Sequence, residues 1–119
     1  EVAAGLAAIH TSGVIHRDVK PDNIWLESPG GRAKLLDFGL ARRWEDAPPL
    51  GSMAGTLVYM APEQAKGNPV DHRSDLFALG VVAYRLLTGQ VPFAGHSMKE
   101  IVDTLLTADP TPIREHNPS

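Results

Sequence analysis

A long apolar segment between Ser74 and Thr88 limits the folds that this chain can adopt. Its apolar residues fall on every side of an expected helix, and they are Leu76, Phe77, Leu79, Val81, Val82, Tyr84, Leu86 and Leu87. A helix that is apolar all round is normally buried. Gly89 suits a left-handed C-cap, and Pro92 prevents any continuation. We therefore predict a buried central helix over about 74–88, around which the other elements pack.

Two further helices are predicted from apolar periodicity. Residues 1–12 carry one apolar face, and Gly13 is the expected C-cap. No N-cap residue stands at the start of this helix, so we expect it to begin before the first residue. A capping box in residues 97–100 opens an amphipathic helix over about 97–107. From Pro110 onward we predict no regular element.

A β-hairpin is predicted just before Asp37. The strand candidates Ile24–Leu26 and Ala33–Leu36 are separated by a Pro-Gly-Gly turn signal at 29–31. A hairpin brings its two outer ends together, so we expect Asn23 and Asp37 to be neighbours. Their amide and carboxylate oxygens are the kind of ligand that Mg²⁺ prefers.

The polar octad at 16–23, His-Arg-Asp-Val-Lys-Pro-Asp-Asn, combines a candidate proton acceptor, a cation and a candidate metal ligand. Asp18 and Lys20 are two residues apart, so in an extended loop both can reach one site from the same side. Asn23 follows five residues after Asp18, and Pro21 disfavours a helix between them. We interpret the octad as a candidate active-site loop.

The composition excludes several classes of site. Cysteine is absent, so the chain has no disulfide framework and no thiolate metal site. The formal charge of −3 gives no basic excess of the kind that indicates nucleic-acid binding. No apolar run reaches the roughly 18 residues that suggest a membrane span, and no signal peptide is visible. The 119 residues have room for one core and not for two ordinary domains.

Four motifs together make the chain resemble a eukaryotic-like (Hanks-type) protein serine/threonine kinase of the bacterial type. They follow the family's order: HRDVKPDN at 16–23, DFG at 37–39, APE at 61–63 and SDLFALG at 74–80. The resemblance implies an α+β, mainly α fold, namely a kinase C-terminal lobe with a small β-hairpin and a buried central helix. Residues 1–119 would then be a partial catalytic domain, with the catalytic loop at 16–23 and the activation segment at 37–63.

The resemblance also implies roles for the polar residues. Asp18 would orient the substrate hydroxyl and accept its proton, and Lys20 would offset charge on the transferred phosphoryl group. Asn23 and Asp37 would hold Mg²⁺ on the phosphates of ATP. Trp25 stands where the family usually has a smaller aliphatic side chain beneath the adenine, so it would either stack on the base or crowd it.

Other residues would support this site by resemblance. His16 and Phe38 would stack into the core and set whether Asp37 points inward, with Gly39 completing the DFG motif. Asp75 would hydrogen-bond the backbone of the catalytic loop and hold it in place.

The activation segment offers two hydroxyls between Gly39 and Tyr59. By resemblance, Ser52 falls at the activating phosphosite and Thr56 at the threonine that contacts the catalytic loop. A phosphate on Ser52 could make bidentate, charge-assisted bonds to Arg17, with Arg42 nearby.

Parts of the family's pattern do not occur in the 119 residues. There is no glycine-rich phosphate loop, no strand lysine and no partnering helix glutamate, so we expect the N-terminal lobe to precede Glu1. In the family, Glu63 pairs with an arginine from the last helices, and Arg114 comes too early to match it. We therefore expect a segment that lacks the last C-terminal helices and has no kinase activity by itself.

The resemblance implies ATP and Mg²⁺ as cofactors, protein substrates with Ser or Thr, no nucleic-acid partner and a cytoplasmic location. Two alternatives remain at this point. One is a non-catalytic kinase-like scaffold or pseudokinase, and the other is an unrelated metal-dependent hydrolase with Asp18, Asn23 and Asp37 as ligands. The other histidines have no metal-ligand spacing and are interpreted as solvated or capping; they are His10, His72, His96 and His116.

Overall fold

The computed structural model describes residues 1–36, 42–43 and 57–118. Five residues singled out above lie outside these ranges: Asp37, Phe38, Gly39, Ser52 and Thr56. Arg42 is described only through the pairing of its backbone.

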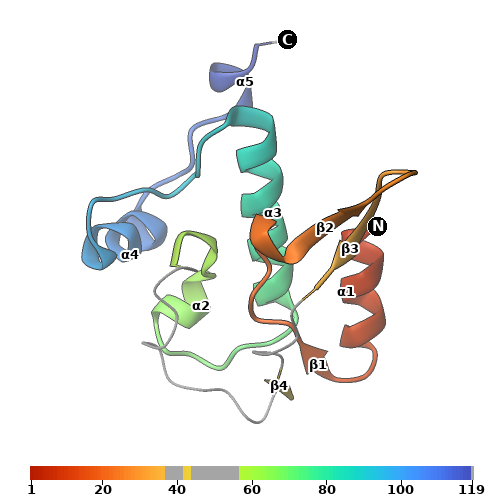
Figure 1. The fold of residues 1–119 in the computed structure, drawn as a ribbon. Coiled ribbons are helices and arrows are strands. Elements are labelled where there is room, and N and C mark those ends of the chain that lie inside the picture. Colours follow the sequence, from red (N-terminus) through yellow and green to blue (C-terminus); the bar gives the residue numbers. More distant parts are fainter. Residues whose placement is uncertain (37–41, 44–56, 119) are drawn as a thin grey trace.

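Helix α3 (Arg73–Thr88) runs through the middle of the structure (Figure 1). Helix α1 (Val2–His10) and a β-hairpin lie on one side of it, and helices α2 (Pro62–Ala65) and α4 (Met98–Thr107) lie on the other. The core forms where these elements meet α3, and its buried members are Leu6, Val19, Tyr59, Ala78, Val81 and Val82. The fold is thus mainly helical with little sheet.

The prediction that α3 is buried on every side is wrong for the described residues. One face of α3 packs into the core, but Leu76, Leu86 and Leu87 are 48%, 77% and 53% exposed. Helix α1, the 3-10 helix η2 (Leu57–Tyr59) and helix α5 (Ile113–His116) contact α3. These elements are short, so they leave part of its apolar surface in solvent.

The predicted hairpin is present. Strand β2 (Ile24–Glu27) pairs antiparallel with strand β3 (Arg32–Leu35), and Ile24 lies opposite Leu35. In the turn between them, Gly30 and Gly31 adopt positive φ angles of 118° and 66°. Side chains rarely allow such angles, which is why a Gly-Gly turn was a good predictor here.

A second small sheet was not predicted. Strand β1 (Val14–Ile15) pairs antiparallel with strand β4 (Arg42–Arg43), and Ile15 lies opposite Arg42. Two-residue strands leave no periodicity to detect in a sequence. This pairing brings the backbone of Arg42 beside the residue that precedes the octad.

The predicted helix ends need two corrections. Helix α1 ends at His10 with Thr11 as its C-cap, and Gly13 takes a positive φ of 71° only after the following turn. The N-cap Ser97 of α4 accepts a hydrogen bond from the Glu100 amide, as a capping box requires. The Glu100 carboxylate, however, accepts from the amide of His96 and not from that of Ser97.

The sequence analysis missed the last helix, α5 (Ile113–His116). Its approach to α3 is fixed by Tyr84, whose hydroxyl donates to the Thr111 carbonyl at 2.7 Å. The ring of His116 lies edge-on to the ring of Tyr84, with centroids 6.0 Å apart. A four-residue helix rich in polar residues shows no periodic pattern in the sequence. Its formation is therefore better explained by its contacts with α3 than by the intrinsic helix propensity of its residues.

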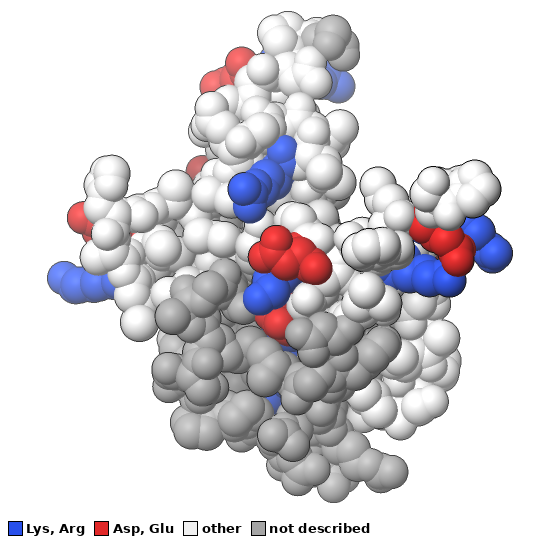
Figure 2. Space-filling view, in the orientation of Figure 1, with Lys and Arg blue, Asp and Glu red and all other residues white. Residues whose placement is uncertain are grey.

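Charged side chains do not gather into one patch on the face shown in Figure 2, where acidic and basic residues lie in small groups. Among the helices that the structure describes, none is long and apolar enough to cross a bilayer.

Candidate functional site

The octad at 16–23 lies between strand β1 and strand β2 and ends in the 3-10 helix η1 (Pro21–Asn23). Four of its polar side chains are buried, namely His16, Arg17, Asp18 and Asn23. Burial of a polar group is costly unless it is hydrogen-bonded. The geometry of the octad is therefore defined by the hydrogen bonds of these residues.

His16 joins the octad to the end of the hairpin. Its Nδ1 accepts a hydrogen bond from the amide of Asp18 at 3.1 Å, and its Nε2 lies 3.0 Å from the carbonyl oxygen of Leu36. Because Nδ1 is an acceptor, the ring proton is on Nε2, which donates to Leu36. The imidazole thus fixes the position of Asp18 relative to the residue that precedes Asp37.

Asp18, Lys20 and Asn23 come together as the sequence analysis expected of one site. The Asn23 Nδ2 donates to the Asp18 carbonyl at 2.7 Å and to Asp18 Oδ2 at 3.0 Å. The Lys20 Nζ lies 3.4 Å from Asp18 Oδ1. Each carboxylate oxygen of Asp18 therefore has its own partner, and both bonds from the Asn23 amide to Asp18 are made by its Nδ2.

Leu36 is held by the octad from two sides. Its amide donates to the Asn23 carbonyl at 2.7 Å, while its own carbonyl accepts from His16 Nε2. Asp37 is the next residue in the chain and lies outside the described residues. These two hydrogen bonds hold Leu36, the residue immediately before Asp37, beside Asn23 and His16.

Asp75, at the start of α3, is 1% exposed and accepts three hydrogen bonds. The amides of His16 and Arg17 each donate to it at 2.8 Å, one to each carboxylate oxygen. The third contact is with His10 Nε2, 2.7 Å from Asp75 Oδ2. The carboxylate thus connects α1, the octad and α3.

Arg17 has a positive φ of 69° and is the one non-glycine residue with such an angle among those that the structure describes. A non-glycine residue in this region costs about 1–3 kcal/mol and persists only where its surroundings enforce it. The bond from its amide to Asp75 is one such constraint. The octad is therefore a strained loop that α3 holds in shape.

His10 corrects the sequence analysis, which interpreted it as solvated or capping. Its side chain is 11% exposed and contacts Asp75, which is 65 positions away in the sequence. The ring of His72 lies beside it, with centroids 5.5 Å apart. No local pattern in the sequence indicates a contact over this separation.

Glu63 was expected to need an arginine from helices beyond the chain. It is partly exposed here, and its Oε1 accepts a hydrogen bond from the Ser74 hydroxyl at 2.5 Å. This contact ties the start of α2 to the start of α3, next to Asp75.

Trp25 is on β2, and its side chain is 60% exposed. Its Cα partner on β3 is Lys34, whose ammonium pairs with Glu27 at 2.9 Å. The indole therefore is not needed to fill the core, and it is accessible two residues after Asn23.

Among the described ranges, no three His, Cys, Asp or Glu side chains are grouped closely enough to hold a metal ion. The octad nevertheless contains oxygen donors that suit a hard divalent cation, because the amide oxygen of Asn23 is not used by Asp18. The second ligand expected from the sequence, Asp37, lies outside the described residues.

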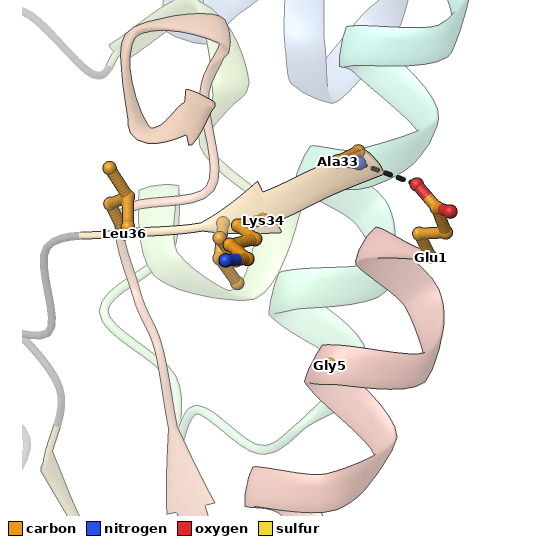
Figure 3. Close-up of a pocket in the computed structure, with 6 residues that line it drawn as sticks. Glu1, Gly5, Ala33, Lys34 and Leu36 are labelled. Atoms are coloured by element: carbon orange, nitrogen blue, oxygen red, sulfur yellow. Dashed lines mark hydrogen bonds between the residues drawn. The ribbon is translucent and has the colours of Figure 1, made fainter. Parts of the chain in front are cut away.

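A separate pocket of about 290 Å³ lies between the start of α1 and β3 (Figure 3). It is lined by Glu1, Gly5 and residues 33–36, and the Glu1 carboxylate accepts a hydrogen bond from the Ala33 amide. No residue of the octad lines it, so it is not part of the candidate site.

Comparisons with known proteins agree with the motifs. The family model of the protein kinase domain matches residues 1–117. The chain is 42% identical over its whole length to serine/threonine-protein kinase pkn2 of Myxococcus xanthus, of which it covers 15%. It is 44% identical over 93% of its length to probable serine/threonine-protein kinase PknB of Corynebacterium glutamicum, and covers 18% of that protein. It is 47% identical over 91% of its length to serine/threonine-protein kinase PknL of Mycobacterium tuberculosis, and covers 27% of it.

Proposed function

The chain belongs to the protein kinase family, and from this premise we propose that it is the C-terminal, catalytic-loop part of a protein serine/threonine kinase. The reaction would transfer the γ-phosphate of ATP to Ser or Thr hydroxyls of protein substrates. The observation that carries the proposal is the cluster of Asp18, Lys20 and Asn23, in which Asp18 and Asn23 are buried, on a loop whose His16 and Arg17 amides are bonded to Asp75.

The chemistry follows from this cluster. Phosphoryl transfer depends on positioning and charge neutralisation more than on covalent catalysis. Asp18 orients the substrate hydroxyl and receives its proton, and its carboxylate is held in place by Asn23 and Lys20. Lys20, whose ammonium lies beside the Asp18 carboxylate, would offset the charge of the transferred phosphoryl group.

The metal site would be completed by two residues. Asn23 directs its amide nitrogen to Asp18, which leaves the amide oxygen for a cation. Asp37 would supply a carboxylate oxygen, since Leu36 is bonded to Asn23. Bound Mg²⁺ would neutralise and align the phosphates of ATP.

The test is radiolabel transfer from [γ-³²P]ATP with Mg²⁺ to a protein substrate by the full-length protein that carries this chain. We expect phosphoserine or phosphothreonine in the product. Nucleotide binding without transfer would instead support a pseudokinase or scaffold. We also propose that residues 1–119 alone are inactive, because no glycine-rich phosphate loop or strand lysine occurs in them. We place the reaction in the cytoplasm, where ATP is available.

Ser52→Ala in the full-length protein is expected to lower activity by about tenfold. A phosphate on Ser52 would bind Arg17, and the pairing of β4 with β1 brings the backbone of Arg42 beside the octad. Activity and the phosphorylation state of Ser52, read by mass spectrometry, check this together. The exposed turn residue Ser28 serves as control, as Ser28→Ala. Unchanged activity with no phosphate at Ser52 would contradict the prediction.

Trp25→Leu is expected to weaken ATP binding by about three- to tenfold. The indole is exposed on β2, two residues after Asn23, so it is accessible for stacking on the adenine, and such contacts contribute about 0.5–1.5 kcal/mol. The dissociation constant of an ATP analogue for the full-length protein measures the effect. Trp25→Phe should retain most of the affinity. Tighter binding by the leucine variant would show that the indole crowds the base.

A further inference from the structure

Arg85 is a charged residue of α3 that the proposed function does not use. Between Leu76 and Thr88 it is the sole charge in an otherwise apolar sequence, and the residue is exposed. Its Nη1 donates a hydrogen bond to the Tyr59 hydroxyl at 2.6 Å, across 26 positions of the chain. The guanidinium is therefore held in a defined place at the surface.

A cation in the last turn of a helix is favourable for the helix dipole, so the position of Arg85 alone indicates no further role. In the part of the chain that the structure describes, however, the ion pairs are made by other cations, namely His10, Lys20 and Lys34. The Tyr59 hydroxyl accepts from Arg85, and its own proton has no acceptor among the same residues. The pair therefore presents guanidinium and hydroxyl donors to a further acceptor.

Tyr59 connects this pair to the core beneath the octad. Its side chain is 4% exposed and belongs to the same core cluster as Val19, the residue between Asp18 and Lys20. The helix that carries it, η2, contacts α3, the helix of Arg85. The guanidinium is thus built on the same core as the candidate proton acceptor.

The separation between Arg85 and the octad suits a bound peptide. Asp75, ten residues before Arg85 on α3, is bonded to the amides of His16 and Arg17, next to Asp18. Ten residues of helix extend over about 15 Å, and an extended peptide advances about 3.3 Å for each residue. A substrate with its hydroxyl at Asp18 therefore reaches the guanidinium within about five residues.

From this placement we infer that Arg85, held by Tyr59, selects protein substrates with an Asp or Glu side chain within about five positions of the phosphorylated residue. The carboxylate would accept from the guanidinium and from the Tyr59 hydroxyl. The inference rests on the proposed function, because it names a substrate class for the same site. Arg85 is then a specificity residue and takes no part in phosphoryl transfer.

The test uses the full-length protein and synthetic peptides with a central Ser in an alanine and glycine background. Each position up to five residues before or after the Ser carries Glu, Ala or Lys in turn. The value of kcat/KM is compared between peptides on the same enzyme preparation. A fraction of misfolded variant lowers all peptides equally, so it does not change their order.

For the wild type we expect a position at which Glu raises kcat/KM about threefold over Ala and about tenfold over Lys. The preference should become smaller at high ionic strength. Arg85→Gln should bring the three peptides to within about twofold of one another, and Arg85→Glu should invert their order. Tyr59→Phe keeps the ring and loses the hydroxyl, so the preference should fall without inversion.

Arg32→Glu is the matched control, because Arg32 is exposed and the change in charge is the same. It lies on β3, in the hairpin on the other side of α3 from α2 (Figure 1). This variant should keep the wild-type preference. A wild type with no preference for Glu at any position would overturn the inference, as would an unchanged preference in Arg85→Glu. An equal shift in Arg32→Glu would also overturn it, since the effect would then come from overall charge.

Peptide binding gives a readout that does not depend on transfer. Dissociation constants are measured by fluorescence anisotropy for the same peptides with Ala in place of the central Ser, in the presence of a non-hydrolysable ATP analogue. The order Glu, Ala, Lys is expected again, with inversion in Arg85→Glu. Equal affinity for the Glu and Lys peptides would overturn the inference. Binding in the expected order without phosphorylation of any Ser peptide would support the role of Arg85 and count against the proposed function.

Discussion

Asp18→Asn in the full-length protein is expected to reduce phosphoryl transfer by at least about a hundredfold, with ATP affinity changed less than threefold. Asn cannot accept the proton of the substrate hydroxyl. It also replaces one acceptor oxygen by a donor, which meets either the Nδ2 of Asn23 or the ammonium of Lys20. Both the proton acceptor and its alignment are lost, while the proposed metal ligands Asn23 and Asp37 remain.

The measurement is initial-rate transfer from radiolabelled ATP to a protein substrate, together with the dissociation constant of a non-hydrolysable ATP analogue. Asp22→Asn is the matched control, because Asp22 is in the same octad and is exposed. It should leave both quantities near the wild-type values. If Asp18→Asn retained more than a tenth of the wild-type rate, Asp18 would not be the proton acceptor.

The short elements that sequence reasoning found are those with strong local signals. The Pro-Gly-Gly turn predicted the hairpin because Gly30 and Gly31 need backbone angles that other residues avoid. The capping box predicted where α4 begins, to within one residue of Met98. Such signals concern only neighbours in the chain, so they are read without knowledge of the fold.

Contacts between residues far apart in the sequence could not be predicted from local patterns. The pairing of β1 with β4 joins residues about 28 positions apart, and neither strand is long enough for a pattern. The contact of His10 with Asp75 spans 65 positions. Nothing in the sequence alone distinguishes a histidine that bonds a buried carboxylate from one that faces solvent.

The apolar pattern of α3 led to the largest error. All-round hydrophobicity predicts burial, yet Leu76, Leu86 and Leu87 are exposed in the described structure. The sequence pattern indicates which faces of a helix are apolar, but a face is buried only if another part of the protein packs against it. Within the described elements, that partner exists for the face that carries Ala78, Val81 and Val82.

Asp75→Leu is expected to lower the free energy of unfolding by about 3–5 kcal/mol, which is a large part of the stability of a typical domain. The carboxylate is almost completely buried and accepts from two backbone amides and one imidazole. Leucine branches at the same carbon but has no acceptor, so the amides of His16 and Arg17 would be left without this partner. A buried donor that loses its acceptor costs about 1–3 kcal/mol.

Thermal unfolding of the full-length protein measures this effect. The relevant transition is the one whose Tm rises when ATP and Mg²⁺ are added. For a domain of kinase size the loss corresponds to a decrease in Tm of roughly 6–20 °C. Asp75→Asn keeps one acceptor oxygen and should fall between leucine and the wild type. Asp103→Leu, at an exposed position of α4, should change Tm by no more than about 2 °C. If the two leucine variants lowered Tm equally, the Asp75 carboxylate would not be what stabilises the octad. The conformation of the loop would then depend on the hydrogen bonds of His16 with Leu36 and Asp18.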